Sequence, residues 1–277
     1  MENERGHHTD QILGIPFFNG TAIQAVERAI ATCGLVVAPS GTCFERFLED
    51  EAYRRAIRTA DVVLPDSGFM VSLWRLLRQR SIQRISGLSY LKQLLGEDGG
   101  APGVASSAEK RATESRLDLR QVFWVLPHER ARALLLAWAE SHSRVIDPAD
   151  CHIAPIYSDD VTDEPLLAMV ETRRPSHVII AIGAGAQEKL GWYLRDRLSA
   201  RPAIHCVGGA LGFLTGDQVA IPEWADRLYL GWFLRLLSQP RVFIPRLWKG
   251  RILPYLIWRY GTELPPLNTA GKQQAAL

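Results

Sequence analysis

The sequence is poor in cysteine and methionine, nearly balanced in charge and free of long apolar runs. Its four cysteines are widely spaced and form no C-x-x-C pair, which argues against a disulfide framework and a structural zinc site. A formal net charge of +2 over 277 residues argues against a protein that coats nucleic acid, so no nucleic-acid partner is expected. No apolar stretch approaches the roughly 18 residues that a membrane-spanning helix needs. Residues 1–10 are polar and lack the apolar segment of a signal peptide, so we expect a disordered N-terminus.

What the sequence does contain is an alternation of short apolar strands and amphipathic helices. This order predicts a parallel sheet covered by helices on both faces. The apolar content of 47% is sufficient to bury such a core. The expected strands are residues 11–18, 34–38, 62–64, 121–126, 178–182 and 203–207, and the expected helices are residues 21–33, 43–59, 69–78, 129–142, 164–173 and 187–198.

Composition divides the chain into an α/β core and less regular segments. The core is expected over residues 11–216, as two α/β halves joined by a mobile linker at about 96–118 that is rich in Gly, Ala, Ser and Glu. A basic, tryptophan-rich appendage is expected over 217–260, and a flexible tail over 261–277.

The appendage combines aromatic residues with positive charge. Residues 222–260 hold four of the eight tryptophans, and seven lysines and arginines against two acidic residues. Indole rings and arginines together are typical of a membrane interface, where the rings lie among lipid headgroups. A packed helical pair with a solvated basic face is the alternative interpretation.

Asp66 is the sharpest local signal. It follows the apolar strand 62–64 through Pro65, so it is expected at the carboxyl edge of the sheet, where α/β proteins bind ligands. One interpretation is a helix-capping or Asx-turn aspartate. The other is a general base that takes a proton from an attacking hydroxyl.

Two glycine-containing turns follow other strands. The segment Gly183-Ala184-Gly185-Ala186-Gln187-Glu188 could bind phosphate through backbone amides at a helix start, or could be a tight turn. It matches neither G-x-G-x-x-G nor a P-loop, which disfavours an NAD-dependent enzyme. Gly208-Gly209 allows the same two interpretations. The seven histidines show no metal-binding spacing, so no metal site is expected.

Five motifs in order resemble the WecG/TagA/CpsF family of glycosyltransferases. The segment Ala60–Gly68 resembles that family's A-D-L-V-L-P-D-G, and Arg84-Ile85-Ser86-Gly87 resembles R-V-[TP]-G. The turn at 183–188 resembles G-x-P-[KR]-Q-E. The remaining matches are Val207-Gly208-Gly209-Ala210 with Phe213, Thr215 and Gly216, and the tail positions Pro222, Trp224, Trp232, Arg235, Leu236, Pro240 and Arg241. The resemblance spans about residues 11–250.

The resemblance implies a fold, a reaction and partners. The fold would be a Rossmann-like α/β domain with a C-terminal helical appendage that associates with the membrane. The reaction would move a hexose-type sugar from a UDP-sugar to a polyprenyl-diphosphate-linked saccharide, with inversion and without a metal or other cofactor. The protein would be cytoplasmic and peripheral on the inner face of the cell membrane, in cell-wall or exopolysaccharide biosynthesis. A homo-oligomer is left open.

The resemblance also implies site residues. Asp66 would be the base and Arg84 an active-site arginine. The residues implied in substrate binding are Ser40, Gly183, Gln187, Glu188, Gly208, Gly209, Arg235 and Arg241, the two tail arginines holding a diphosphate.

The chain departs from the family pattern at several of these positions. Ser40 stands where the family has Asn. Gly185 and Ala186 stand where the 183–188 turn has Pro and a basic residue. Such departures also suit a non-catalytic, membrane-associated α/β binding protein derived from the same fold, which is the alternative function.

Overall fold

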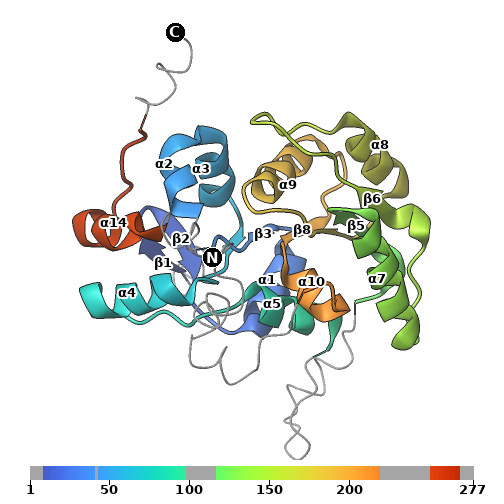
Figure 1. Ribbon diagram of the computed structural model, residues 1–277, viewed down its shortest axis with the longest axis horizontal. Coiled ribbons are helices and arrows are strands. Elements are labelled where there is room, and N and C mark those ends of the chain that lie inside the picture. Colours follow the sequence, from blue (N-terminus) through green and yellow to red (C-terminus); the bar gives the residue numbers. More distant parts are fainter. Residues whose placement is uncertain (1–8, 41–42, 98–116, 219–249, 269–277) are drawn as a thin grey trace, which may run out of the picture.

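The computed structural model describes residues 9–40, 43–97, 117–218 and 250–268, and it contains one eight-stranded sheet (Figure 1). The strands follow the order β1-β2-β4-β3-β8-β7-β5-β6. β1 pairs with β2 antiparallel, and every other pairing is parallel. The strands are β1 (Thr9–Ile12), β2 (Ile15–Phe18), β3 (Leu35–Val37), β4 (Val62–Val63), β5 (Val122–Leu126), β6 (Cys151–Ile153), β7 (His177–Ile180) and β8 (Ala203–Cys206).

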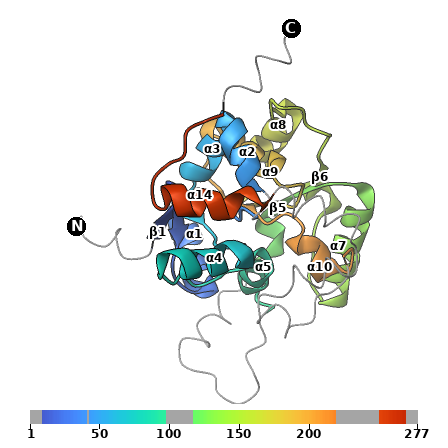
Figure 2. The same ribbon diagram turned by 60° about the vertical axis from the view of Figure 1, so that its left-hand side comes forward.

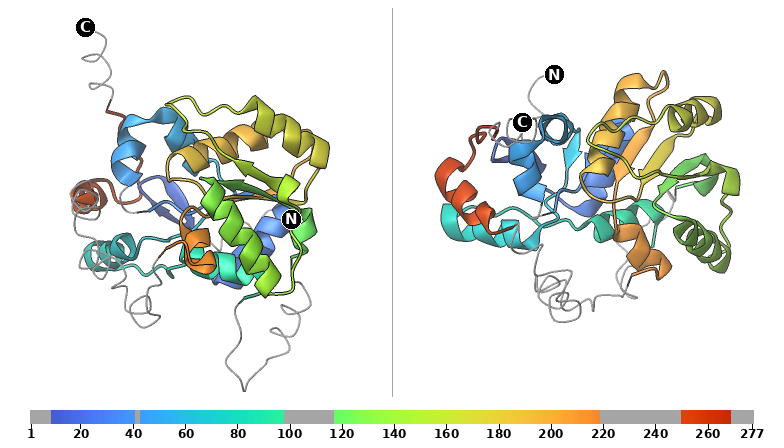
Figure 3. Two further views of the ribbon diagram at one scale, coloured as in Figure 1. Left: turned by 45° about the vertical axis from the view of Figure 1, so that its right-hand side comes forward. Right: turned by 45° about the horizontal axis from the view of Figure 1, so that its top comes forward.

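Helices cover both faces of the sheet (Figures 2 and 3), which confirms the predicted α/β class with a mostly parallel sheet. One face carries α2 (Phe44–Glu49), α3 (Glu51–Arg58), α4 (Gly68–Arg78), α8 (Glu164–Arg173), α9 (Ala186–Arg197) and α14 (Ile252–Tyr260). The other face carries α1 (Ala22–Thr32), α5 (Gly87–Leu95), α7 (Glu129–Ser141) and α10 (Ala210–Thr215).

Each central strand contributes side chains to two hydrophobic cores, one on each face of the sheet. In β3, Leu35 and Val37 pack into one core while Val36 packs into the other. Successive side chains point to opposite faces of a strand, so a strand covered on both faces has to be apolar throughout. This is why the central strands appear in the sequence as continuous apolar runs.

Two predicted elements differ from the structure. Residues 11–18 form part of the hairpin β1–β2 and not one strand, because the chain reverses at Leu13 and Gly14, both with positive φ. The helix predicted at 43–59 is two helices. Asp50 has extended backbone between them, and its carboxylate accepts a hydrogen bond from the Tyr53 N–H at the start of α3. The edge strand β6 was not predicted.

The described part of the C-terminal region packs on the N-terminal half of the chain. α14 lies beside α4 (Figure 2) and buries Leu253, Leu256 and Ile257. The Arg78 guanidinium donates to the carbonyl oxygen of Ile257 at 2.8 Å. The backbone of residues 261–268 also hydrogen-bonds to the core, as in the contact from Asn268 N–H to Leu48 O at 2.7 Å. Residues 261–268, the described part of the predicted tail, are thus hydrogen-bonded to the core, and a flexible tail stays a prediction.

Several predictions fall on residues that the structure does not describe. These are the termini 1–8 and 269–277, most of the predicted linker (98–116) and most of the predicted appendage (219–249), which includes Arg235 and Arg241. Among the described residues, no helix combines the length and apolar character needed to cross a membrane.

Candidate active site

The candidate site lies where four adjacent strands end at the carboxyl edge of the sheet. In the order β4-β3-β8-β7, these strands lead respectively to Asp66, Ser40, Gly208 and Gly183. The first half of the chain meets the second between β3 and β8, which lie side by side at the centre of Figure 1. A switch of this kind opens a crevice at the strand ends, and open α/β sheets bind their ligands there.

Asp66 and Arg84 are brought together at the end of β4. The Arg84 Nε donates to the backbone carbonyl oxygen of Asp66 at 2.9 Å. The Asp66 carboxylate oxygen Oδ1 accepts the backbone N–H of Gly87 at 3.0 Å. Gly87 is the first residue of α5, whose N-cap is Ser86, so Asp66 accepts a further N–H at the start of this helix, while Ser67 caps α4. The Asp66 contact is thus made to a helix that begins 21 residues further along the chain.

The start of α5 links the ends of three strands. A Cβ placed on Gly87 would lie 3.5 Å from the carbonyl oxygen of Val207 and 3.9 Å from the Cβ of Ala38. Val207 follows β8 and Ala38 follows β3. Asp66 is therefore held beside the β3 and β8 loops through its contact with Gly87. Asp66 and Arg84 are only partly buried, as groups that meet a substrate need to be.

The turn at residues 183–188 is stabilised from within. The Gly185 N–H donates to Glu188 Oε2 at 2.5 Å, and the Gln187 Nε2 donates to Glu188 Oε1 at 3.1 Å. Glu188 is fully buried, and burial raises the pKa of its carboxyl group. Gly185 has φ +95°, which favours glycine. Glu188 and Gly185 thus hold the turn, and a substrate contact of Glu188 stays a prediction.

Gln187 connects this turn to the next strand end. Its side chain packs against Gly208, where a Cβ would lie 3.3 Å from both amide heavy atoms. Gly208 has φ +54°, so both its conformation and its surroundings require glycine. Gly209 faces the side chain of Gln218, whereas a Cβ on Gly183 would meet no atom within 4 Å. The open side of Gly183 leaves room for a ligand.

Ser40 lies over a buried thiol. Its Oγ is 3.2 Å from the Sγ of Cys43, and its carbonyl oxygen accepts the Cys43 N–H at 3.0 Å. Burial raises the pKa of the Cys43 thiol, so this cysteine is not an activated nucleophile. In the described ranges, no three His, Cys, Asp or Glu side chains gather as a metal site requires.

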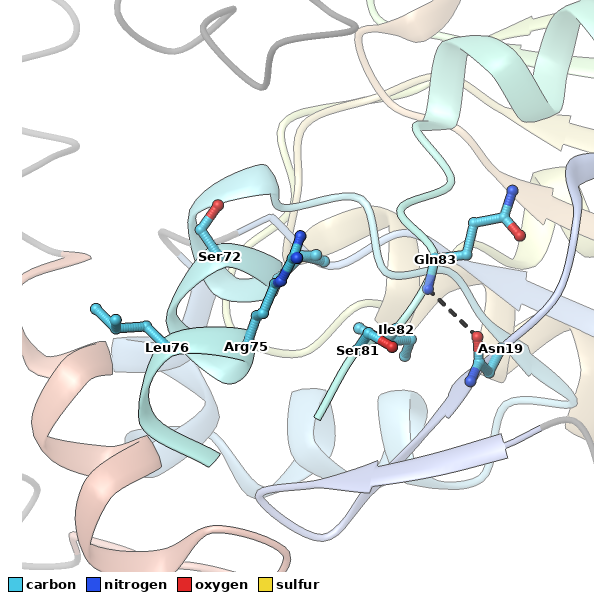
Figure 4. A pocket seen from close by; sticks show the side chains of 8 residues that line it. Asn19, Ser72, Arg75, Leu76, Ser81, Ile82 and Gln83 are labelled. Carbon is cyan, nitrogen blue, oxygen red and sulfur yellow. Dashed lines mark hydrogen bonds between the residues drawn. The ribbon is translucent and has the colours of Figure 1, made fainter. Parts of the chain in front are cut away.

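Two features of this edge were not predicted. Arg46 of α2 extends to the 183–185 turn, where its Nη1 donates to the carbonyl oxygen of Ala184 at 2.8 Å. A pocket also lies between α4 and the segment that leads to Arg84 (Figure 4). Its lining residues are Asn19, Val71, Ser72, Arg75, Leu76, Ser81, Ile82 and Gln83. Neither feature has a local sequence signal, because each joins residues that are distant in the sequence.

The Gln83 N–H donates to Asn19 Oδ1 at 3.3 Å across this pocket. Asn19 follows β2, the neighbour of β4 on the side away from β3. The pocket and the glycine turns therefore lie on opposite sides of Asp66.

Comparison with known proteins decides the family. The model of the glycosyl transferase WecG/TagA/CpsF family matches residues 11–265, nearly the whole described core. The chain belongs to this family. This WecG/TagA/CpsF-family protein is therefore a glycosyltransferase, as its motifs predict.

A curated relative supports the same class. The chain is 27% identical over 195 residues to N-acetylglucosaminyldiphosphoundecaprenol N-acetyl-beta-D-mannosaminyltransferase of Bacillus subtilis (strain 168). The match covers 70% of this WecG/TagA/CpsF-family chain and 67% of the relative.

Proposed function

We propose that this glycosyltransferase moves a hexose-type sugar from a UDP-sugar to a polyprenyl-diphosphate-linked saccharide, with inversion, in cell-wall or exopolysaccharide biosynthesis. The observation that carries the proposal is the pair Asp66 and Arg84 at the end of β4, between the glycine turns that follow β7 and β8 and a separate pocket. The family and the name of the Bacillus relative support the substrate classes.

In the proposed mechanism Asp66 acts as the general base. Its carboxylate accepts the proton of the acceptor hydroxyl while the hydroxyl oxygen attacks the anomeric carbon of the donor sugar. The bond from that carbon to the UDP oxygen breaks, and attack opposite the leaving group inverts the centre. The developing negative charge on UDP needs positive groups nearby. We propose that arginines supply this charge, with Arg235 and Arg241 as predicted contributors, and that no metal is required.

The strand order suggests how the two substrates are separated. Neighbouring parallel strands are about 4.8 Å apart, so β4 and β7, with two strands between them, are roughly 14 Å apart. An extended nucleotide sugar suits the edge from the turn at 183–188 to Asp66. The acceptor then approaches from the other side, where the pocket offers Arg75 beside apolar Val71 and Ile82.

A lipid-linked acceptor also requires access to a membrane surface. Leu76 of α4 is 75% exposed, and Trp258 and Tyr255 of α14 are 66% and 54% exposed. Exposed Arg75 and Arg259 accompany them on the same two helices, which lie side by side (Figure 2). Aromatic rings with arginines suit the headgroup region of an anionic membrane. We propose that the α4–α14 pair and the predicted appendage dock peripherally on the inner face of the cell membrane.

The substrate proposal is tested with purified full-length protein. UDP release is measured with a panel of UDP-sugars and a polyprenyl-diphosphate-linked saccharide incorporated in vesicles. The proposal expects release with at least one donor that depends on the acceptor. If no combination of donor and acceptor releases UDP, the proposal is contradicted.

The membrane proposal is tested separately by vesicle flotation. Replacing Trp258 and Tyr255 with alanine should reduce binding to anionic vesicles, because their rings are proposed to enter the headgroup region. The variant should still fold, because neither side chain is buried in the core. Replacing the exposed Val145 with alanine, at 68% exposure on another surface, serves as the control. Equal binding by all three proteins would exclude α14 as a docking element.

A further inference from the structure

Arg46 occupies an unusual position above the turn at residues 183–185. It belongs to α2, which follows β3, yet its Nη1 lies 2.8 Å from the carbonyl oxygen of Ala184 after β7. A Cβ placed on Gly185 would be only 1.3 Å from Nη1. The guanidinium therefore fills the volume that any side chain at position 185 would take, and it is exposed toward solvent.

The remaining groups of this turn are less able to bind an anion. The Gly185 N–H is already donated to Glu188. Lys189, the next cation along α9, is buried, and its Nζ contacts Asp50 Oδ2 at 2.8 Å and the carbonyl oxygen of Asp159 at 2.7 Å. A guanidinium carries five N–H donors, and Arg46 uses one on Ala184 among the described residues. Arg46 therefore brings an exposed positive charge to this turn.

Arg46 lies beside a part of the sequence that departs from the family pattern. The 183–188 turn lacks both the proline and the basic residue of G-x-P-[KR]-Q-E, since residues 185 and 186 are Gly and Ala. The glycine makes the space that Arg46 enters. A positive charge lost from the turn is thus present again on a different element, 140 residues earlier in the chain.

We propose that Arg46 binds the diphosphate of the nucleotide sugar and replaces the basic residue missing at position 186. This inference rests on the proposed function and adds a substrate-binding residue to it. Planar guanidinium groups suit phosphate oxygens because two N–H donors can bind together. The open side of Gly183 gives the diphosphate room beside Arg46.

Equilibrium binding of UDP and of uridine separates this role from a structural one. Arg46→Ala should weaken UDP binding roughly ten- to hundredfold, the range for a lost charged hydrogen bond, and leave uridine binding unchanged. Arg46→Lys should weaken UDP binding less, because lysine keeps the positive charge. Arg120→Ala is the control, because Arg120 is an exposed arginine that precedes β5 at the opposite edge of the sheet.

The double variant Arg46→Ala/Ala186→Lys tests the replacement itself. It should recover much of the lost UDP affinity by restoring a cation at the turn. Equal weakening of UDP and uridine would show that Arg46 only shapes the turn, and unchanged UDP binding by Arg46→Ala would also overturn the inference. If wild-type protein binds UDP through Arg46 but transfers no sugar, the proposed function fails while this inference stands.

Discussion

Replacing Asp66 with asparagine removes the proposed base while keeping its structural contact. Asparagine retains an oxygen that accepts the Gly87 N–H, which lies 3.0 Å from Asp66 Oδ1. The replacement then removes only a negative charge near the start of α5, which should lower the free energy of unfolding by about 0.3–1 kcal/mol. A lost general base instead reduces turnover by roughly 10²–10⁴, which corresponds to about 3–5 kcal/mol in the barrier. The two effects differ enough to be separated.

The assay compares transfer rates and urea unfolding of wild type and Asp66→Asn. Asp118→Asn is a matched control, because Asp118 also accepts a backbone N–H, that of Arg120, at the opposite edge of the sheet. We expect both variants to fold and only Asp66→Asn to lose turnover. Near wild-type turnover by Asp66→Asn would refute the role of Asp66 as base.

Three further predictions concern the glycine turns, pH and metal. Gly208→Ala should lower the free energy of unfolding by about 1–2 kcal/mol because the φ of Gly208 is +54°, whereas Gly183→Ala should leave it unchanged. Urea unfolding measures both, and equal effects of the two variants would contradict the difference between the two glycines. Burial lowers the pKa of His177 to about 4, from about 6.5 when unfolded. As the pH falls, the imidazole of the unfolded chain is protonated before that of the folded protein, so the free energy of unfolding should fall by up to about 3 kcal/mol between pH 6.5 and pH 4. In His177→Gln the free energy of unfolding should depend less steeply on pH, and an unchanged dependence would contradict this assignment. Chelation with EDTA should leave transfer unaffected, and activity lost to EDTA and restored by Mg²⁺ or Mn²⁺ would disprove the metal-independent mechanism.

The central strands and the site loops after them could be predicted because their signals are local. An apolar run such as Val62-Val63-Leu64 followed by Pro65 and Asp66 predicts both a buried strand and the place of its end. Parallel strands put such ends on one edge, so the sequence alone predicts that Asp66, Ser40, Gly183 and Gly208 lie at the same edge.

Other features could not be predicted because they depend on tertiary packing. The segment 43–59 has a continuous helical pattern, and nothing local shows that the backbone at Asp50 becomes extended. The contact of Arg46 with Ala184 joins residues 138 apart in the sequence. The contact of Asp66 with the Gly87 N–H at the start of α5 is equally non-local, and the N-caps of α4 and α5 are Ser67 and Ser86, not Asp66.

The mass of the lipid-linked product distinguishes sugar transfer to the acceptor from hydrolysis of the donor. Wild-type protein is incubated with a UDP-sugar and a polyprenyl-diphosphate-linked saccharide in vesicles, and the extracted lipid is analysed by mass spectrometry. We expect that the lipid-linked saccharide gains one sugar residue and that Asp66→Asn forms almost none of this product. Release of UDP with the sugar recovered free in water, and no change in the mass of the lipid, would contradict this expectation.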